Sequence, residues 1–223
     1  MKNMRTMLMI VMLTLVGMAS ADNLTIEKAK IKAGGKKQIA VSLKNPSKQY
    51  EAFQFDLVLP NGVSIAKNEK GNMITSLNGG RKVDHSLSVK LQEDKSYRFM
   101  SYSLDDRAYK GTDGALVYVT LEANAALSLG NKDIIIKSQV FTDINGDLSK
   151  WDDISTTIEI VKFIPGDVNS DGEIDEKDVD ALVSHIMGKT PEGFDMEAAD
   201  ANQDTNVDAA DIVTIIKYIK EME

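Results

Sequence analysis

One stretch of twelve residues decides how the C-terminal part of this chain folds: Asp167-Val-Asn169-Ser-Asp171-Gly172-Glu173-Ile-Asp175-Glu176-Lys177-Asp178. The same pattern recurs 33 residues later as Asp200-Ala-Asn202-Gln-Asp204-Thr205-Asn206-Val-Asp208-Ala209-Ala210-Asp211. In both copies, side chains that carry oxygen stand at positions 1, 3, 5, 9 and 12. A repeat at a fixed period indicates two structural units of the same kind.

The spacing of these oxygens is that of a loop that wraps a hard cation. Calcium takes about six to eight oxygen ligands at roughly 2.3–2.6 Å, several from carboxylates, with a backbone carbonyl at position 7. Each loop is therefore predicted to bind one Ca2+ ion, with position 9 acting directly or through water. The predicted ligands are Asp167, Asn169, Asp171, the Glu173 carbonyl, Asp175 and Asp178 in the first loop, and Asp200, Asn202, Asp204, the Asn206 carbonyl, Asp208 and Asp211 in the second.

The two loops depart from the EF-hand pattern at two positions. Position 12 is Asp in both copies where the EF-hand has Glu, so a shorter carboxylate must reach the cation. Position 6 is Gly172 in the first loop and Thr205 in the second, and the sharp turn there favours glycine. We therefore expect the second site to be the weaker one. Two solvated acidic turns are the competing interpretation, and the repetition in register favours calcium over it.

Each loop is followed by one predicted helix. Apolar residues recur at helical spacing after both loops: Val179, Leu182, Val183 and Ile186 after the first, and Ile212, Ile215, Ile216 and Ile219 after the second. The segment Phe163-Ile164-Pro165-Gly166 precedes the first loop, and its proline and glycine exclude a helix that enters this loop. The predicted unit is small and all-α, with the order loop then helix, twice.

This segment resembles the type I dockerin family. The first repeat reads GDVNSDGEIDEKDVDALVSHIM, the second reads AADANQDTNVDAADIVTIIKYI, and the likeness covers Pro165 to Glu223. Dockerins are small non-catalytic modules with two F-hand calcium repeats, which attach secreted proteins to cohesin modules, often in cellulosome-like assemblies that degrade polysaccharides. The resemblance implies two Ca2+ ions, a cohesin-type partner protein and no reaction.

The same resemblance implies which residues touch the partner. In the family, recognition positions are positions 10, 11, 17 and 18 of each repeat. In this chain they are Glu176, Lys177, Val183 and Ser184 in the first repeat, and Ala209, Ala210, Ile216 and Lys217 in the second. The two sets differ in charge and size, so we expect one of the two possible docking orientations to dominate.

The first 21 residues have the pattern of a signal peptide. Lys2 and Arg5 form a basic start, Met7 to Val16 an apolar stretch, and Ala19-Ser20-Ala21 a cleavage site with small residues. The apolar stretch is shorter than the roughly 20 residues that a membrane-spanning helix needs. The chain contains no cysteine, which excludes disulfides. We expect a secreted protein that is extracellular or associated with the bacterial cell surface.

Charge separates two parts of the chain. From Asp167 to Glu223 there are 16 acidic and 4 basic residues, a net charge of −12, whereas the whole chain carries −8. The rest of the chain is therefore slightly basic, and the acidic surplus belongs to the segment with the two loops. Acidic side chains at this density repel one another unless cations neutralise them. No basic patch is interleaved with aromatics, so nothing indicates nucleic acid binding.

Between Asp22 and Lys162 the apolar period changes to two, which is typical of strands. Glycine, proline and asparagine clusters separate the strands, so we expect eight or nine short strands in an antiparallel sandwich or jelly roll. The predicted strands are Leu24–Ile26, Ile39–Leu43, Phe53–Leu59, Leu87–Leu91, Tyr97–Tyr102, Leu116–Leu121, Ile134–Ile136 and Ile154–Val161. The chain is thus predicted to be mainly β, with a signal peptide at 1–21, a β-sandwich domain at 22–163 and a dockerin domain at 164–223.

The opening of the sandwich resembles a cohesin-like or carbohydrate-binding sandwich. The resemblance is carried by the segments Ala33-Gly34-Gly35-Lys36, Leu43-Lys44-Asn45-Pro46 and Tyr50-Glu-Ala-Phe-Gln-Phe-Asp-Leu-Val-Leu-Pro60. It implies a jelly roll of the cohesin kind, and another secreted sandwich stays open as the alternative because such folds host many functions.

The sandwich offers little that could carry catalysis. His85 in Asp84-His85-Ser86 is expected at an exposed strand edge, since catalytic triads are defined by geometry rather than by adjacency. Asp105 and Asp106, read as neighbours on one strand, would point to opposite faces. Asp143-Ile-Asn145-Gly146-Asp147 is interpreted as a hairpin turn. The aromatic candidates for a sugar platform are Tyr50, Tyr97, Tyr102, Tyr109, Tyr118 and Trp151, and most are better explained as core or edge residues.

The sequence therefore predicts a secreted, non-enzymatic protein whose dockerin docks to a cohesin partner, in polysaccharide utilisation. One alternative is a carbohydrate-binding or adhesion protein in which the calcium module only supports the sandwich, and a glycan-active enzyme is the third. The linker Lys162 to Gly166 is short and apolar, so we expect the two modules to pack against each other through Phe163 and Ile164.

Overall fold

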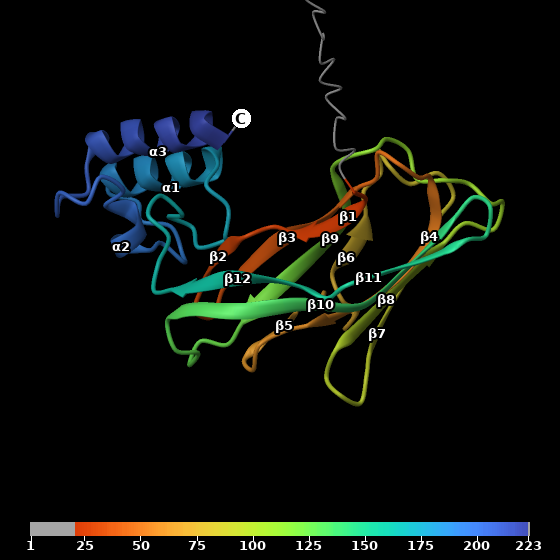
Figure 1. The fold of residues 1–223 in the computed structure, drawn as a ribbon. Helices are drawn as coiled ribbons and strands as arrows, with labels where there is room; N and C mark the ends of the chain where they lie inside the picture. The colour runs from red at the N-terminus through yellow and green to blue at the C-terminus, as the bar shows by residue number, and fades with distance from the viewer. Residues whose placement is uncertain (1–20, 223) are drawn as a thin grey trace, which may run out of the picture.

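The computed structural model describes residues 21–222, and the predicted signal peptide lies outside the described residues apart from Ala21. It is mainly β, as the apolar periods predict (Figure 1). The strands are β1 (Asn23–Ile26), β2 (Ala29–Lys32), β3 (Lys36–Lys44), β4 (Tyr50–Val58), β5 (Val63–Ile65), β6 (Thr75–Leu77), β7 (Ser86–Leu91), β8 (Tyr97–Tyr102), β9 (Ala115–Ala123), β10 (Gly130–Asp143), β11 (Leu148–Trp151) and β12 (Ile154–Val161). The helices are α1 (Glu176–Ile186), α2 (Met196–Ala199) and α3 (Ala209–Met222).

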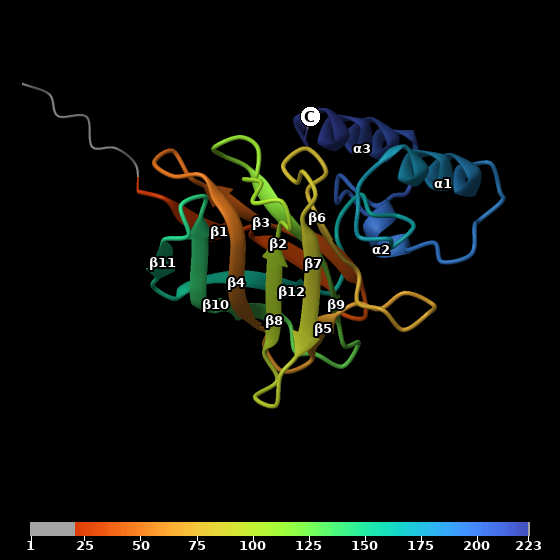
Figure 2. The same cartoon turned by 90° about the vertical axis from the view of Figure 1, so that its right-hand side faces the viewer.

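The strands form two sheets that face each other (Figure 2). One sheet has the order β1-β3-β9-β5, with β6 also paired to β9, and the other has the order β2-β12-β10-β4-β8-β7, with β11 also paired to β10. All pairs are antiparallel except β2 and β12, which run parallel. The pairing of β2 with β12 brings the beginning of the sandwich beside its end, next to the helices.

The core between the sheets follows the predicted alternation of apolar and polar residues. Four phenylalanines of the seven-stranded sheet form its centre, with ring centroids 4.9 Å apart for Phe55 and Phe99 and 5.4 Å apart for Phe53 and Phe55. Phe141 joins them from β10. Burying a large apolar side chain stabilises a fold by about 1.5–3 kcal/mol, so this aromatic centre is a main source of the sandwich's stability.

The structure contains more strands in its described residues than the eight or nine that the sequence predicts. The additional strands β2, β5, β6 and β11 have only three or four residues each. A period of two is hard to recognise in so short a segment, and these strands form because longer neighbours offer them hydrogen bonds. The hairpin predicted at Asn145-Gly146 is confirmed as the turn between β10 and β11.

Two expectations about the sandwich are wrong. His85 is not exposed: its relative accessibility is 7%, its ring stacks on Tyr109 at 3.8 Å between centroids, and Nδ1 accepts a hydrogen bond from the Val83 amide. Asp105 and Asp106 lie in the loop after β8 rather than on a strand. In both cases the residue lies in a loop beside a strand, so the strand period does not predict its surroundings.

A buried arginine holds several loops at this end of the sandwich. The Arg81 guanidinium donates to the carbonyls of Leu43, Lys110, Gly111 and Gly114 and to the Asn45 side chain, at 2.7–3.1 Å. The bonds to the Leu43 carbonyl and to Asn45 are buried, so Arg81 satisfies two acceptors that water does not reach.

The helices form a second, separate core, and the two predicted loop-following helices are confirmed as α1 and α3. The core is built from Val168, Ala181, Leu182, Ala199, Ala201 and Ile215. The sequence did not indicate α2, a single turn that leads directly into the second loop. As predicted, no helix precedes the first loop among the described residues. No described helix is long and apolar enough to cross a membrane.

The junction between the two parts is polar rather than apolar. Phe163 and Ile164 are half-buried and belong to neither core. The helices lie beyond one end of the sandwich, next to β2 (Figure 1), and lysines of the sandwich pair with acidic residues there: Lys32 with Asp195, Lys37 with Glu173, and Lys162 with Glu197.

The burial of His85 predicts a pH dependence of stability. Burial lowers the pKa of His85 below its ordinary value, although the Asp84 carboxylate works in the opposite direction. The unfolded chain, with a histidine pKa of about 6.5, therefore binds the proton more readily than the folded chain. The stability that neutral His85 contributes to the folded state is therefore complete above the unfolded pKa. It declines as the pH falls below that value, towards the pKa of the folded state.

We expect His85→Phe to remove this decline while keeping the stacking on Tyr109. The measurement is denaturant unfolding between pH 8 and pH 5 with calcium present, followed through Trp151, the chain's only tryptophan, which packs on Phe141. Wild type should lose stability relative to the variant as the pH falls, and parallel curves would contradict the assignment.

Candidate metal centre

The carboxylate at position 12 closes each of the two loops. In the first loop, Asp178 accepts hydrogen bonds from the amide of Asn169 at 3.0 Å and from the amide of Asp175 at 2.9 Å. In the second, Asp211 accepts from the amides of Asn202 at 3.1 Å and Asp208 at 2.9 Å. Both carboxylates are fully buried. One aspartate thus ties the two ends of each loop to the first turn of the helix that follows it.

Positions 1, 3 and 5 hold the interior of the loops with matching bonds. Position 1 accepts from the amide of position 6, at 3.2 Å in the first loop and 2.9 Å in the second. Position 3 accepts from the amide of position 5, and position 5 from the amide of position 7, at 2.8–2.9 Å in both loops. The structure therefore gives the predicted ligands at positions 1, 3 and 5 equivalent hydrogen bonds in both loops.

Position 6 takes the left-handed conformation in both loops. The φ angle is 91° at Gly172 and 76° at Thr205. A threonine at positive φ is strained, but the second loop nevertheless has the same hydrogen bonds as the first. The second loop therefore carries the backbone strain that its threonine predicts, and this strain leaves the hydrogen bonds of the loop intact.

The residues at position 9 have a role that the ligand pattern alone did not indicate. Asp175 is the N-cap of α1, accepts a hydrogen bond from the Lys177 amide at 2.8 Å and forms a capping box with Asp178. Asp208 accepts from the Ala210 amide at 2.7 Å in the same way. An N-cap of this kind stabilises a helix by about 1 kcal/mol. The side chains at position 9 thus bind the N-terminus of the following helix, and Asp175 also accepts from the Lys177 ammonium group at 2.9 Å.

The electrostatics of the first loop favour a bound cation. Asp167 is 2% exposed, and burial, together with the nearby charge of Asp178, raises its pKa to about 6, although Gly172 and Lys32 act in the opposite direction. Burial also raises the pKa of Asp178. The Oδ1 atom of Asp167 is buried and has no hydrogen-bond partner. Buried carboxylates of this kind need a positive partner.

The donor set also fits calcium rather than a metal that needs nitrogen or sulfur. Within residues 21–222 there is no group of three or more His, Cys, Asp or Glu side chains placed to hold a metal by themselves. Each loop instead combines aspartates with an asparagine side chain and a backbone carbonyl, all of them hard oxygen donors. The residues present therefore fit Ca2+.

The first loop also contacts the sandwich, which sequence reasoning missed. Lys37 of β3 donates to the Gly172 carbonyl and pairs with the Glu173 carboxylate, both at 2.9 Å. Lys32 of β2 donates to the Ser170 hydroxyl at 2.8 Å and pairs with Asp195. A Cβ atom on Gly172 would lie 2.1 Å from the Lys36 carbonyl oxygen. The only indication of these contacts in the sequence is the net positive charge of the part of the chain that precedes the first loop.

The predicted partner-binding residues are accessible on the helical unit. Glu176, Lys177, Ala209, Ala210, Ile216 and Lys217 are exposed, and Val183 and Ser184 are half-buried. None of the eight side chains contacts the sandwich through a hydrogen bond or ion pair in the part of the chain that the structure describes. The contact with the sandwich and the predicted partner residues thus use different parts of the helical unit.

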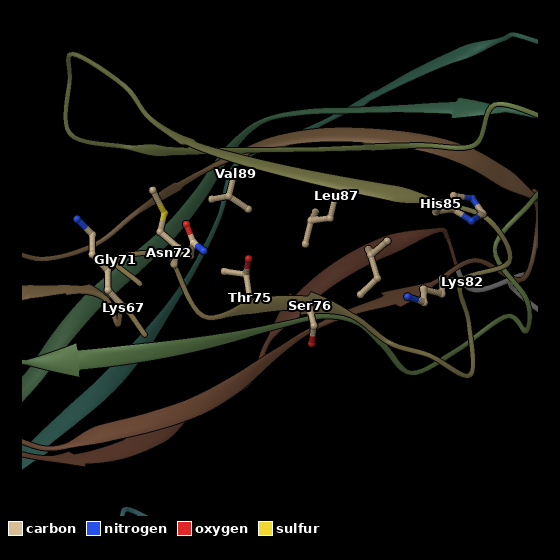
Figure 3. A pocket seen from close by; sticks show the side chains of 11 residues that line it. Lys67, Gly71, Asn72, Thr75, Ser76, Lys82, His85, Leu87 and Val89 are labelled. Carbon is tan, nitrogen blue, oxygen red and sulfur yellow. The ribbon is translucent and has the colours of Figure 1, made fainter. Parts of the chain in front are cut away.

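A hollow of about 540 Å³ opens between the edge strands β6 and β7 of the two sheets (Figure 3). Leu87 and Val89 of β7 face Thr75 of β6 across it, and His85 and Lys82 lie at one end. Its lining contains no carboxylate and none of the six aromatic candidates for sugar binding. Tyr50 and Tyr109 are instead buried in the core. The hollow therefore supports neither the glycosidase hypothesis nor the sugar-platform hypothesis.

Comparison with known proteins identifies both parts of the fold. Residues 165–220 match the family model of the dockerin type I domain, which implies calcium binding by this segment. A search among curated proteins finds no match.

The sandwich has a cohesin-like fold. Similar solved structures include a cohesin module from a Clostridium perfringens family 33 glycoside hydrolase, with 13% identity, a TM-score of 0.51, and coverage of 64% of this chain and 98% of that one. Another is the seventh type I cohesin of ScaB from Pseudobacteroides cellulosolvens, with 14% identity, a TM-score of 0.53 and coverage of 65% and 94%. A third is the sixth cohesin of scaffoldin B from Acetivibrio cellulolyticus, in complex with a dockerin, with 13% identity, a TM-score of 0.54 and coverage of 64% and 100%. Likeness at these identities establishes the fold.

The two residues at position 6 provide a matched pair of variants. Gly172→Thr should force the first loop away from β3, because the new Cβ meets backbone rather than a movable side chain, and we expect a loss of about 1–3 kcal/mol. The reciprocal variant Thr205→Gly should change stability by less than about 1 kcal/mol, since relief of backbone strain offsets the added freedom of the unfolded chain. Far-UV circular dichroism melts of residues 22–223 measure both, and equal losses would contradict the close approach.

Proposed function

We propose that this chain is a secreted, non-catalytic docking protein whose C-terminal module binds two Ca2+ ions and attaches to a cohesin-type partner. The observation that carries the proposal is the pair of equivalent loops, each closed by a buried aspartate that accepts two backbone amides. The match of residues 165–220 to the dockerin type I domain supports the same function. The dockerin complex among the structurally similar proteins agrees with this kind of partnership.

The proposed ligands are the side chains at positions 1, 3, 5 and 12 and the backbone carbonyl at position 7 of each loop, with position 9 acting through water. Bound calcium would supply the positive charge that the buried Asp167 and Asp178 require. The residues of the chain position the helices: Asp178 and Asp211 connect each loop to the helix that follows it, and α1 and α3 pack on a shared core. A closed loop thereby fixes the direction of the helix that carries the partner residues.

We propose that the partner is recognised by Glu176, Lys177, Val183 and Ser184 together with Ala209, Ala210, Ile216 and Lys217. The first set offers an acidic and a basic side chain, whereas the second offers two alanines, an isoleucine and a lysine. A partner surface that complements one set is a poor match for the other. One docking orientation should therefore dominate.

The sandwich is proposed to hold the module through the lysine contacts at its end, as a cohesin-like support rather than an enzyme. The signal-peptide pattern of the first 21 residues and the dockerin match support secretion. The proposed role in polysaccharide utilisation rests on the resemblance to dockerins. The contacts of Lys32, Lys37 and Lys162 favour a module that is held in place over one that swings on a free linker.

The test of the proposal is calcium-dependent binding to cohesin modules from the source organism, measured by calorimetry with residues 22–223. We expect a complex in calcium that is lost on addition of chelator, and calorimetry with CaCl2 alone should show two bound ions. Asp167→Ala should abolish the first of these two sites. Failure to bind calcium, or partner binding that chelator leaves intact, would refute the proposed function.

Charge reversal tests the single orientation. Lys177 is position 11 of the first repeat and Lys217 is position 18 of the second, and both side chains are exposed. The variants Lys177→Glu and Lys217→Glu therefore serve as controls for each other. If one orientation dominates, one variant should lose about tenfold or more in affinity while the other stays near wild type, because buried interface charges contribute far more than exposed ones. Equal losses in both variants would contradict a single mode.

A further inference from the structure

The sandwich contacts the first of the two predicted calcium loops through two lysines. Lys37 reaches the Gly172 carbonyl and the Glu173 carboxylate, and Lys32 reaches the Ser170 hydroxyl. These residues are positions 4, 6 and 7 of the first loop. In the described part of the chain, no sandwich side chain forms a hydrogen bond or an ion pair with the second loop, from Asp200 to Asp211. The two loops, nearly identical in their internal bonds, therefore differ in their surroundings.

The two lysine ammonium groups lie in partly buried positions. The side chain of Lys37 is 24% exposed and that of Lys32 is 26% exposed, while its partner Asp195 is 15% exposed. Charges at such positions interact more strongly than charges at an open surface, because less water screens them. By contrast, Lys162 and Glu197, which also join the two parts of the chain, are 66% and 50% exposed.

The lysine contacts involve the loop backbone next to a predicted calcium ligand. Lys37 donates to the carbonyl of Gly172 and pairs with the side chain of Glu173. The backbone carbonyl of Glu173 is the predicted calcium ligand at position 7. The close approach of Gly172 to Lys36 leaves no space for a side chain at position 6. The second loop has an exposed threonine there. Glycine at position 6 is therefore required by the contact with the sandwich as well as by the turn.

We propose that Lys32 and Lys37 act on the first loop as built-in cations, which hold it closed without metal and weaken its affinity for calcium, so that the second loop fills first. The reason is electrostatic. The Lys32 charge acts on the buried Asp167 carboxylate, and Lys37 pairs with Glu173 of the same loop. Both charges offset part of the loop's negative charge and oppose the arrival of a divalent cation. This order of filling is opposite to the one that the glycine and threonine at position 6 predict from the turn alone.

The lysines also link calcium to the contact between the two parts of the chain. If they weaken calcium binding at the first loop, calcium in that loop must weaken the lysine contacts by the same factor, since coupling between two binding events is reciprocal. The first site would then report on how firmly the module is held against the sandwich. This inference rests on calcium binding by the first loop, as proposed above.

The experiment uses residues 22–223 with Asp204→Ala, which silences the exposed second loop and leaves the first loop to be measured alone. In this background, Lys32→Met with Lys37→Met should bind CaCl2 about three- to tenfold tighter by calorimetry. The same double variant should melt at a lower temperature in calcium-free buffer, followed by the helical circular dichroism signal. Lys32→Arg with Lys37→Arg retains the charges and should stay near the parent in both measurements.

Lys162→Met is the matched control, because it breaks a contact between the two parts of the chain without touching a loop. It removes no charge next to the first loop, so it should change calcium affinity much less than the methionine double variant does. Unchanged or weaker binding by the methionine double variant would overturn the inference while the proposed calcium function stands. No calcium binding by the Asp204→Ala parent would refute the first site itself. If the double variant does not fold without metal, Lys37→Met alone supplies the same comparison, and tighter binding is again the expected result.

Discussion

The burial of the aspartate at position 12 of each loop is the constraint on which the C-terminal module depends. Asp178 and Asp211 accept two backbone amides each, and these bonds close the loop and start the helix at the same time. A carboxylate in this position must be compensated by hydrogen bonds and by positive charge. The loop and the first turn of the helix therefore stabilise one another, and the proposed calcium ion would add the positive charge that the buried carboxylates lack.

The way in which the two parts of the chain meet follows from the same excess of negative charge. An apolar junction through Phe163 and Ile164 would have been independent of the loops, but these residues belong to neither core. The basic sandwich instead presents lysines to an acidic module, and two of them reach the first loop. Polar contacts of this kind are directional and sensitive to nearby charge. Under the coupling proposed above, they would make the attachment of the module respond to calcium in its first loop.

The sandwich is stabilised by different means from the module. Its centre is a group of stacked phenylalanines that requires no ligand, and its loops are joined at one end by Arg81. The hollow lies between the edge strands β6 and β7, and neither Lys32 nor Lys37 lines it.

The sequence by itself determined the features that depend on neighbours along the chain. The period of two between Asp22 and Lys162, the helical spacing after each loop and the oxygen pattern of the loops were sufficient for the mainly β fold, for α1 and α3 and for the candidate ligands, because each is a local pattern. Only the tertiary structure decided the burial of His85, the short strands β2, β5, β6 and β11, and the contacts of Lys32 and Lys37 with the first loop. The lysine contacts join residues 135 or more positions apart, and no local period records which surfaces meet when the chain folds.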